Sequence, residues 1–311
     1  MKFDIAEKLL TAGLYVFAMV TVAGTAMAAS DFPDAAASDP NTLGLMQGSP
    51  PAPDKRVMQP DSNFFSFPKL RWTVCHIREL MPTKQVSRGL GAPVLLEYSL
   101  DDGIDAVTFM PMGGDKLMTW KEALAANYTD GMLVMHKGKV VYENYMGCLA
   151  EAGKHAAMSM TKSMTGLLAE ILVAEGTLDD KALVSTIIPE LADSAFADAT
   201  VRQVMNMTTG LAYSEDYANP KADIWVYSAA ANPMPKPADY EGPIGYDEYL
   251  QTVKKEGKHG EAFGYKTINT DALGWIVSRV SGKSITELLS ERIWSRMGAE
   301  QDGYFTVDGI G

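Results

Sequence analysis

A serine followed three residues later by a lysine is the pattern in this chain best suited to covalent chemistry. On a helix, residues i and i+3 lie on the same face, so the lysine ammonium can reach the serine oxygen. A nearby ammonium favours the deprotonated serine, the form that attacks a carbonyl carbon. The pattern occurs twice in the 311 residues, at Ser66-Phe67-Pro68-Lys69 and at Ser159-Met160-Thr161-Lys162.

Only the second occurrence has a suitable local context. Pro68 pushes Phe67 out of helical geometry, so Ser66 and Lys69 would not share a helix face. Ser159 instead begins a strongly periodic helical segment, whose N-terminus favours negative charge on the serine. The alternative for Ser159 is a helix N-cap with a solvated Lys162.

A tyrosine about a hundred residues further on is the candidate partner base. Tyr265 lies in Gly264-Tyr265-Lys266-Thr267-Ile268-Asn269, immediately before a second apolar helix. An ammonium close to a tyrosine favours its phenolate form, which can accept a proton. Lys162 could therefore make Tyr265 a general base if the two side chains meet.

Other functional classes find little support in the sequence. The chain has no H-E-x-x-H, no G-x-S-x-G and no Walker A loop. Its histidines have no metal-ligand spacing and are expected to be structural or surface residues; they are His76, His136, His155 and His259. The 27 Lys and Arg against 39 Asp and Glu give a net charge of −12, which argues against nucleic-acid binding.

Hydrophobic spacing predicts the elements that would position these residues. Apolar residues recur three and four apart from 159 to 175, and the pattern stops at Gly176. Further helices are expected over 200–207, ending before Gly210 in Thr208-Thr209-Gly210, and over 270–280. Ser284 begins a capping box for another helix that stops at Gly298. Strand-like runs at 132–136 and 139–143 predict a hairpin around Lys137-Gly138, and 304–307 predicts a strand. The Pro-, Asn-, Tyr- and Gly-rich stretch 216–261 is expected to form long surface loops.

From about residue 68 to its end, the chain resembles the serine hydrolases of the penicillin-recognising family. This family includes class C β-lactamases, family VIII esterases and, most similar here, the 6-aminohexanoate-dimer hydrolases. The matching segments are 71–72, 76–80, 127–131, 158–166, 207–211, 215–217 and 269–275.

The resemblance implies roles for five residues. Ser159 would be the nucleophile, Lys162 its activating partner and Tyr265 the general acid and base. Tyr217 corresponds to a loop tyrosine that folds over the substrate amide, with a surface-loop aromatic as the alternative. Thr267 occupies the third position of a Tyr-x-Asn/Ser motif, where threonine keeps the hydroxyl and adds a methyl group.

The implied fold is α/β (α+β), with an antiparallel sheet flanked by helices and an inserted helical subdomain. We expect a Pro/Ala-rich extended arm over 29–69, an α/β hydrolase domain from 70–158 plus 264–311, and a helical and loop-rich subdomain over 159–263. The family's third motif lies on a later strand that supplies one N–H group of the oxyanion hole. Because the chain ends at Gly311, we expect this sheet and the oxyanion hole to be incomplete.

Residues 1–28 are typical of an export signal. Lys2 and Lys8 surround a short start, an apolar stretch follows, and Ala26-Met27-Ala28 gives the small-x-small cleavage pattern. A retained membrane anchor is the alternative. The only cysteines, Cys75 and Cys148, could pair in an oxidising compartment or remain as buried thiols.

Together these observations predict a periplasmic or secreted serine hydrolase acting on small amides or esters through an acyl-enzyme. Lysine and tyrosine can move the protons, so the reaction needs no metal or organic cofactor. The alternative is a truncated, inactive family member that binds a ligand or has no function.

Overall fold

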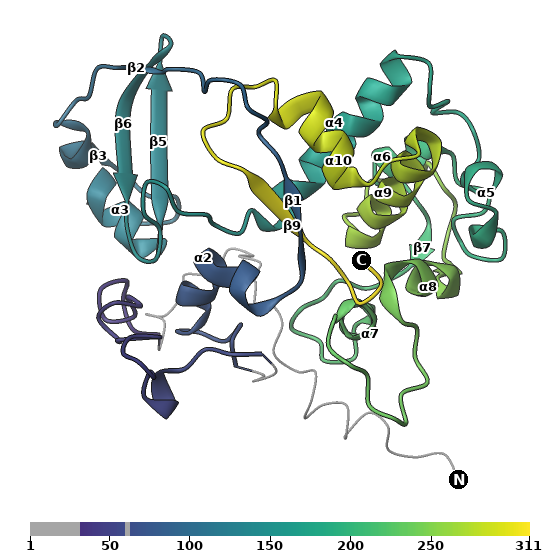
Figure 1. Ribbon diagram of the computed structural model, residues 1–311, viewed down its shortest axis with the longest axis horizontal. Coiled ribbons are helices and arrows are strands. Elements are labelled where there is room, and N and C mark those ends of the chain that lie inside the picture. Colours follow the sequence, from purple (N-terminus) through teal and green to yellow (C-terminus); the bar gives the residue numbers. More distant parts are fainter. Residues whose placement is uncertain (1–31, 60–62) are drawn as a thin grey trace. The chain divides into compact units, whose positions relative to one another are not determined.

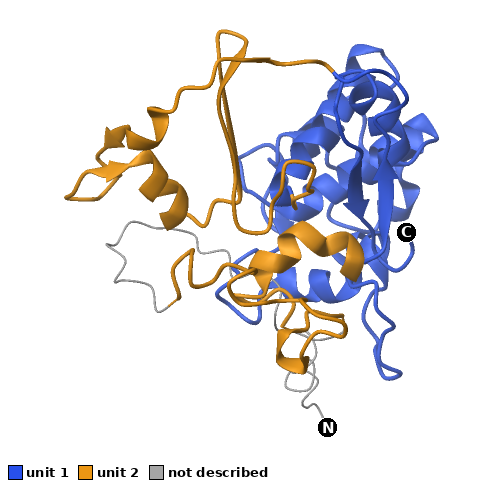
Figure 2. Ribbon diagram, turned by 60° about the vertical axis from the view of Figure 1, so that its left-hand side comes forward, with its two compact units in different colours: residues 1–14, 81–93, 157–311 blue, residues 15–80, 94–156 orange. Residues whose placement is uncertain are grey.

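The computed structural model describes residues 32–59 and 63–311 (Figure 1). The predicted signal segment 1–28 lies outside the described residues. The described chain divides into two compact units (Figure 2). Unit 1 contains residues 81–93 and 157–311, and unit 2 contains residues 32–59, 63–80 and 94–156.

In the described residues, unit 2 combines a three-stranded sheet and a two-stranded sheet, β3-β4, with two α-helices and short 3-10 turns. Its elements are η1 (Pro53–Lys55), α2 (Leu70–Leu80), β2 (Glu97–Tyr98), η2 (Ile104–Ala106), β3 (Thr108–Phe109), β4 (Met118–Thr119), α3 (Trp120–Ala126), β5 (Gly131–His136) and β6 (Lys139–Tyr145). β5 and β6 pair antiparallel, which confirms the predicted hairpin around Lys137-Gly138. β2 pairs parallel with β6, so the three-stranded sheet β2-β6-β5 is mixed rather than wholly antiparallel.

A buried ion pair and a disulfide bond hold the N-terminal part of unit 2 together. Arg71 on α2 binds Asp130 at 3.2 Å, and both side chains are less than one-tenth exposed. Arg71 also donates to the Ala35 carbonyl oxygen at 2.6 Å. Cys75 on α2 is bonded to Cys148 after β6, with their Cα atoms 6.0 Å apart. The structure therefore resolves the choice between paired and free cysteines in favour of the pair.

The segment predicted as an extended arm is folded where it is described. Residues 35–38 and 40–46 form turns, and apolar side chains from the segment are buried. Leu45, Val57 and Phe64 are each less than one-tenth exposed. The proline-rich composition indicated an irregular backbone, but these apolar residues between the prolines still pack into unit 2.

Unit 1 is mainly helical, with two short two-stranded sheets. Its elements are β1 (Thr83–Val86), η3 (Met158–Met160), α4 (Thr161–Ala174), α5 (Val184–Ile187), η4 (Pro189–Leu191), α6 (Val201–Met205), β7 (Leu211–Ala212), α7 (Asp223–Ala231), α8 (Gly245–Thr252), β8 (Lys254–Lys255), α9 (Thr267–Ser281), α10 (Ile285–Leu289), η5 (Ser290–Trp294, a π-helical turn) and β9 (Gly303–Thr306). β1 pairs antiparallel with β9, and β7 pairs antiparallel with β8. These elements agree with the α/β class that the sequence predicts.

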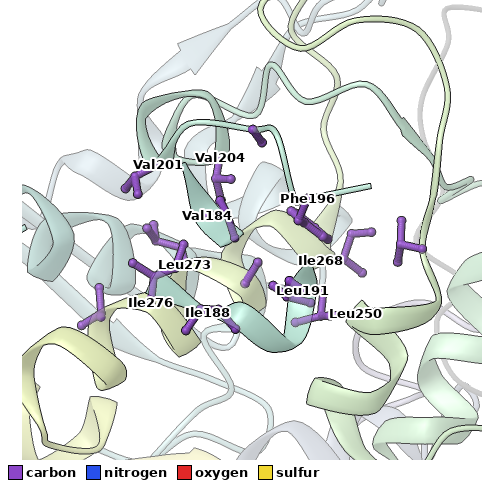
Figure 3. Packing of buried hydrophobic residues seen from close by; sticks show 14 of the residues in the cluster. Val184, Ile188, Leu191, Phe196, Val201, Val204, Leu250, Ile268, Leu273 and Ile276 are labelled. Atoms are coloured by element: carbon purple, nitrogen blue, oxygen red, sulfur yellow. The ribbon is translucent and has the colours of Figure 1, made fainter. Parts of the chain in front are cut away.

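Helix α9 is the centre of unit 1. It contacts α4, α5, α6, α8 and α10. Ile268, Leu273 and Ile276 on α9 join a buried apolar cluster with Leu191 and Phe196 (Figure 3). Burying such side chains contributes about 1.5–3 kcal/mol each. The core therefore fixes α9 and the helices that pack on it.

Helix α4 packs on α9 through the C-terminal part of its apolar stripe. Leu168 and Leu172 are buried, as the spacing predicts. Met160 and Leu167 differ from the prediction, since they are 70% and 47% exposed. The turn before α4 and one face of the helix therefore stay accessible to solvent, while the face that carries Leu168 and Leu172 is anchored in the core.

Two further predicted helix boundaries are confirmed. Thr200 accepts from the Gln203 N–H and begins α6 with a capping box, and Ser284 does the same for α10 with Glu287. Residues 208–210, which were predicted only to end a helix, also contact α9. The Thr209 hydroxyl donates to Asn269 Oδ1 on α9 at 2.7 Å, and both residues are buried.

The prediction of long loops over 216–261 is wrong in part, because α7 and α8 form there. Ile224, Tyr227 and Ala230 are three residues apart on α7 and are buried. Tyr227 and Tyr249 of α8 make an edge-to-face pair with ring centroids 5.5 Å apart. Aromatic packing thus stabilises two helices within a composition that otherwise favours loops. The prolines and glycines occupy mainly the connection between these helices.

The boundaries of the two compact units differ from those of the predicted domains. Residues 264–311 group with 157–263 in unit 1, whereas the sequence predicted a domain from 70–158 plus 264–311. The pairing of β1 with β9 and the packing of α9 against α4 link these segments within unit 1.

Among the helices of the described residues, none has both the length and the apolar character needed to cross a bilayer.

Candidate active site

Ser159 lies in the 3-10 turn η3, directly before α4. The preceding residue, Met158, has φ 46, a left-handed conformation that is unfavourable for a side chain of this size. Such backbone strain is found frequently at functional sites. Ser159 itself is exposed. Its hydroxyl therefore lies at an accessible helix N-terminus, where the helix dipole favours negative charge.

Two predicted partners contact the Ser159 hydroxyl oxygen. Lys162 Nζ donates to Ser159 Oγ at 3.1 Å from the first turn of α4. The Tyr265 hydroxyl donates to the same oxygen at 2.8 Å. Lys162 Nζ also lies 5.5 Å from the centre of the Tyr265 ring. The three predicted side chains thus meet at one oxygen, and all belong to unit 1.

The segment before α9 is fixed in a way that directs Tyr265 toward Ser159. The Gly264 N–H donates to the Met207 carbonyl oxygen at 2.9 Å. The Lys266 ammonium donates to the carbonyl oxygen of Leu211 on β7. The residues on both sides of Tyr265 are therefore held by backbone groups that follow α6. The Tyr265 side chain remains 45% exposed.

The two predicted substrate-binding residues, Tyr217 and Thr267, both contact the carboxylate of Glu215, which was not predicted as a site residue. The Tyr217 hydroxyl and the Thr267 hydroxyl each donate to Glu215 Oε1 at 2.6 Å. The Thr267 backbone N–H donates to Glu215 Oε2 at 2.7 Å. Glu215 lies in one of the segments that carry the family resemblance. This family resemblance was the only feature of the sequence that pointed to Glu215.

The surroundings keep Tyr217 in its neutral form. Burial and the hydrogen bond to Glu215 raise the pKa of Tyr217 well above its ordinary value. Its ring also packs edge-to-face against Trp225 at a centroid distance of 6.2 Å. The Tyr217 phenol is thus a fixed, protonated group rather than a titrating one.

A second carboxylate that sequence reasoning missed is Asp271, one turn into α9. Tyr227 on α7 donates to Asp271 Oδ2 at 2.9 Å. Burial raises the pKa of Asp271 to about 6, while the Tyr227 hydrogen bond and the positive charge of Lys162 act in the opposite direction. Asp271 is therefore a nearby negative charge for the Lys162 ammonium.

This arrangement is chemically suited to proton transfer at a nucleophilic serine. Oxygen atoms 2.8 Å apart are within the range for direct transfer between Ser159 and Tyr265. The ammonium of Lys162 stabilises negative charge on either oxygen.

The described residues contain one group of side chains with metal-binding potential, and it lies in unit 2. Ligand atoms of Cys75, Cys148 and His155 lie within 4.8 Å of one another. The two sulfur atoms are bonded to each other, so they do not provide thiolate ligands in this form. His155 Nε2 instead lies 3.1 Å from Asp130 Oδ2. This cluster is thus a structural part of unit 2.

Comparison with known proteins identifies similar chains. The sequence profile of the Beta-lactamase family matches residues 122–307, more than half of the chain. The 6-aminohexanoate-dimer hydrolase of Paenarthrobacter ureafaciens is 32% identical over 244 residues, which cover 78% of this chain and 59% of that protein. The solved structure of a putative 6-aminohexanoate-dimer hydrolase from Bacillus anthracis superposes with a TM-score of 0.72 at 29% identity, and the match covers 80% of this chain and 64% of that one. The chain thus spans about three-fifths of the length of these relatives.

Proposed function

We propose, from the premise that this chain belongs to the beta-lactamase family, that it is a serine hydrolase. It would cleave small amides or esters through an acyl-enzyme on Ser159. The observation that carries this proposal is the Ser159 oxygen, which accepts hydrogen bonds from both Lys162 Nζ and the Tyr265 hydroxyl.

For acylation Tyr265 first releases its hydroxyl proton to solvent, since the adjacent Lys162 ammonium favours the phenolate. Ser159 Oγ then attacks the substrate carbonyl carbon while its proton passes to the Tyr265 oxygen. Tyr265 then gives this proton to the leaving amine nitrogen or alkoxide oxygen as the carbonyl–leaving-group bond breaks. In deacylation, water attacks the ester carbonyl, Tyr265 takes the water proton, and Ser159 leaves with that proton. Lys162 donates a hydrogen bond to Ser159 Oγ and stabilises negative charge on the two oxygens.

The relatives and the site support a proposal for the substrate class. The two relatives are named 6-aminohexanoate-dimer hydrolase and putative 6-aminohexanoate-dimer hydrolase, and a dimer of an amino acid is joined by an amide bond. The exposed Ser159 and the partly exposed Tyr265 suit a small, open-chain substrate. We therefore favour linear amides of the aminohexanoate type, with carboxylic esters as the second class.

A fluorophosphonate probe tests the nucleophile directly, because it reacts with activated serines. We expect the purified protein to be labelled at Ser159 and to hydrolyse a nitrophenyl ester. Ser159→Ala should abolish both activities. Ser163→Ala is the matched control, since Ser163 is an exposed serine on the same helix. Equal labelling of wild type and Ser159→Ala would refute the assignment.

We also propose that the protein is exported. The Cys75–Cys148 disulfide supports this, because structural disulfides persist mainly in oxidising compartments. Mass spectrometry of the periplasmic or secreted protein should show a mature chain that begins at Ala29. A protein that retains residues 1–28 in the membrane fraction would support the anchor instead.

A further inference from the structure

Gly210, directly before β7, uses both of its backbone groups to bind the segment that leads to Tyr265. Its carbonyl oxygen accepts from the Glu256 N–H at 3.1 Å. Its N–H donates to Nδ1 of His259 at 2.9 Å. A Cβ added to Gly210 would lie 2.6 Å from the Glu256 carbonyl oxygen, so a side chain does not fit between the two backbones. His259 thus satisfies a backbone donor at a point where the two segments approach closely.

Two further hydrogen bonds join the same segments nearer to Tyr265. The Gly260 N–H donates to the Thr208 carbonyl oxygen at 2.6 Å. The Gly264 N–H donates to the Met207 carbonyl oxygen at 2.9 Å, and Gly264 directly precedes Tyr265. The position of Tyr265 therefore depends on how firmly these two segments are joined.

The contacts of the His259 ring determine its protonation state. A backbone N–H can only donate, so Nδ1 must be the unprotonated nitrogen. Nε2 then carries the ring proton and donates to Asp198 Oδ1 at 3.1 Å. The Asp198 carboxylate also accepts from the Lys255 ammonium, and the His259 side chain is only 4% exposed. The contact with Gly210 therefore requires the neutral ring, because a protonated ring would direct an N–H at the Gly210 N–H.

We propose that His259 is a positioning residue for Tyr265, the general acid and base of the proposed mechanism. Its neutral ring anchors Gly210 and so helps to hold the Tyr265 hydroxyl 2.8 Å from Ser159 Oγ. This inference rests on the proposed function at Ser159. A misplacement of about 1 Å at a reacting group can cost about 10²-fold in rate, so a loosened Tyr265 segment should slow the reaction.

Two amide substitutions separate the two contacts of the ring. In His259→Asn the side-chain oxygen takes the place of Nδ1 and can accept from Gly210. In His259→Gln the longer side chain places its amide near the position of Nε2 and keeps the contact with Asp198. We expect kcat/KM on a nitrophenyl ester to fall at least about tenfold for His259→Gln and to stay within about threefold of wild type for His259→Asn. Each variant loses one ring contact, so the two melting temperatures should fall alike.

A double-mutant cycle tests whether His259 acts through Tyr265. His259→Gln in the Tyr265→Phe background should add little, because the group that it misplaces is already absent. His136→Gln is the matched control, since His136 is an exposed histidine at the end of β5 in unit 2, and it should leave the rate unchanged. Nitrogen-15 NMR of the wild-type protein at neutral pH should show an unprotonated Nδ1 on His259. This measurement and the His259→Asn kinetics keep the test decisive if His259→Gln fails to fold.

The outcomes separate this inference from the proposed function. Labelling of Ser159 with equal rates for His259→Asn and His259→Gln, an additive loss in the Tyr265→Phe background, or a protonated Nδ1 would overturn the role of His259 alone. Absence of fluorophosphonate labelling in the wild-type protein would overturn the proposed function, and the His259 role with it.

Discussion

The Tyr265 hydroxyl and Ser159 Oγ lie 2.8 Å apart although 106 residues separate them in the sequence. The packing of α4 against α9 produces this contact, because each residue lies just before the start of one of these helices. The buried apolar faces of the two helices therefore support the geometry of an exposed site. Proton transfer between the two oxygens needs no further movement of the backbone.

The first prediction concerns that proton route. Tyr265→Phe removes the hydroxyl while keeping the ring that packs near Lys162, so the fold should be retained. We expect kcat/KM for a nitrophenyl ester to fall by about 10²–10⁴, the usual contribution of a general acid–base group. Steady-state kinetics with a thermal melt as control measure this. A variant with wild-type rates would show that another group accepts the Ser159 proton.

The second prediction uses the raised pKa of Asp271. Its ordinary pKa is 3.8 and burial raises it to about 6 in the folded protein. The folded state therefore binds the proton more tightly than the unfolded state, and Asp271 lowers stability increasingly as pH rises from about 4 to 6. The full cost above pH 6 is at most about 3 kcal/mol, reduced by the partial exposure of the residue.

Asp271→Asn removes this charge and keeps an oxygen that can accept from Tyr227. We expect the variant to be more stable than wild type at pH 8 in urea unfolding, with the difference falling to about 1 kcal/mol or less at pH 4.5. Asp216→Asn at an exposed site serves as control. A difference that grows toward acid pH would contradict the assignment.

The parts of the site that were predictable from sequence depend on local spacing. Ser159 and Lys162 are one turn apart, so helix geometry alone brings them together. Tyr265 was identified from its place before an apolar helix and from the family resemblance. Glu215 and Asp271 could not be predicted from spacing, because their partners Thr267 and Tyr227 lie on elements that are distant in the sequence.

In the fold, too, features set by local sequence were predictable, and features set by contacts between distant segments were not. The hairpin β5–β6 and the capped helices α6 and α10 follow from turn and cap residues within a few positions. Helix α7 was missed because composition suggested loops, whereas edge-to-face contacts of Tyr227 with Tyr213 and Tyr249 stabilise it. The Cys75–Cys148 pairing likewise depends on the approach of α2 to the segment after β6, which no local pattern records.

The third prediction concerns His155 in unit 2. Its hydrogen bond to Asp130 raises the pKa of His155 above its ordinary value of 6.5. The protonated pair therefore stabilises unit 2 fully below about pH 6.5, and this contribution is lost as pH rises through the higher folded pKa. His155→Gln should lower the melting temperature more at pH 5.5 than at pH 8.5. An equal decrease at both pH values would indicate a role in packing rather than in charge.

The fourth prediction concerns the backbone beside the buried Arg71–Asp130 ion pair. Gly147 has φ 57, and an added Cβ would lie 2.1 Å from Asp130 Oδ1 and 2.8 Å from Arg71 Nη2. Gly147→Ala must therefore both adopt an unfavourable backbone and displace one partner of a buried ion pair. Breaking such a pair costs about 3–5 kcal/mol.

Gly138→Ala in the β5–β6 turn separates the two effects. Gly138 has φ 79, but nothing lies within 4 Å of its added Cβ. It should lose only about 1–2 kcal/mol from the left-handed backbone. We expect Gly147→Ala to lower the urea midpoint clearly more than Gly138→Ala does. Equal losses for the two variants would show that the ion pair can move aside, and that unit 2 does not depend on its position.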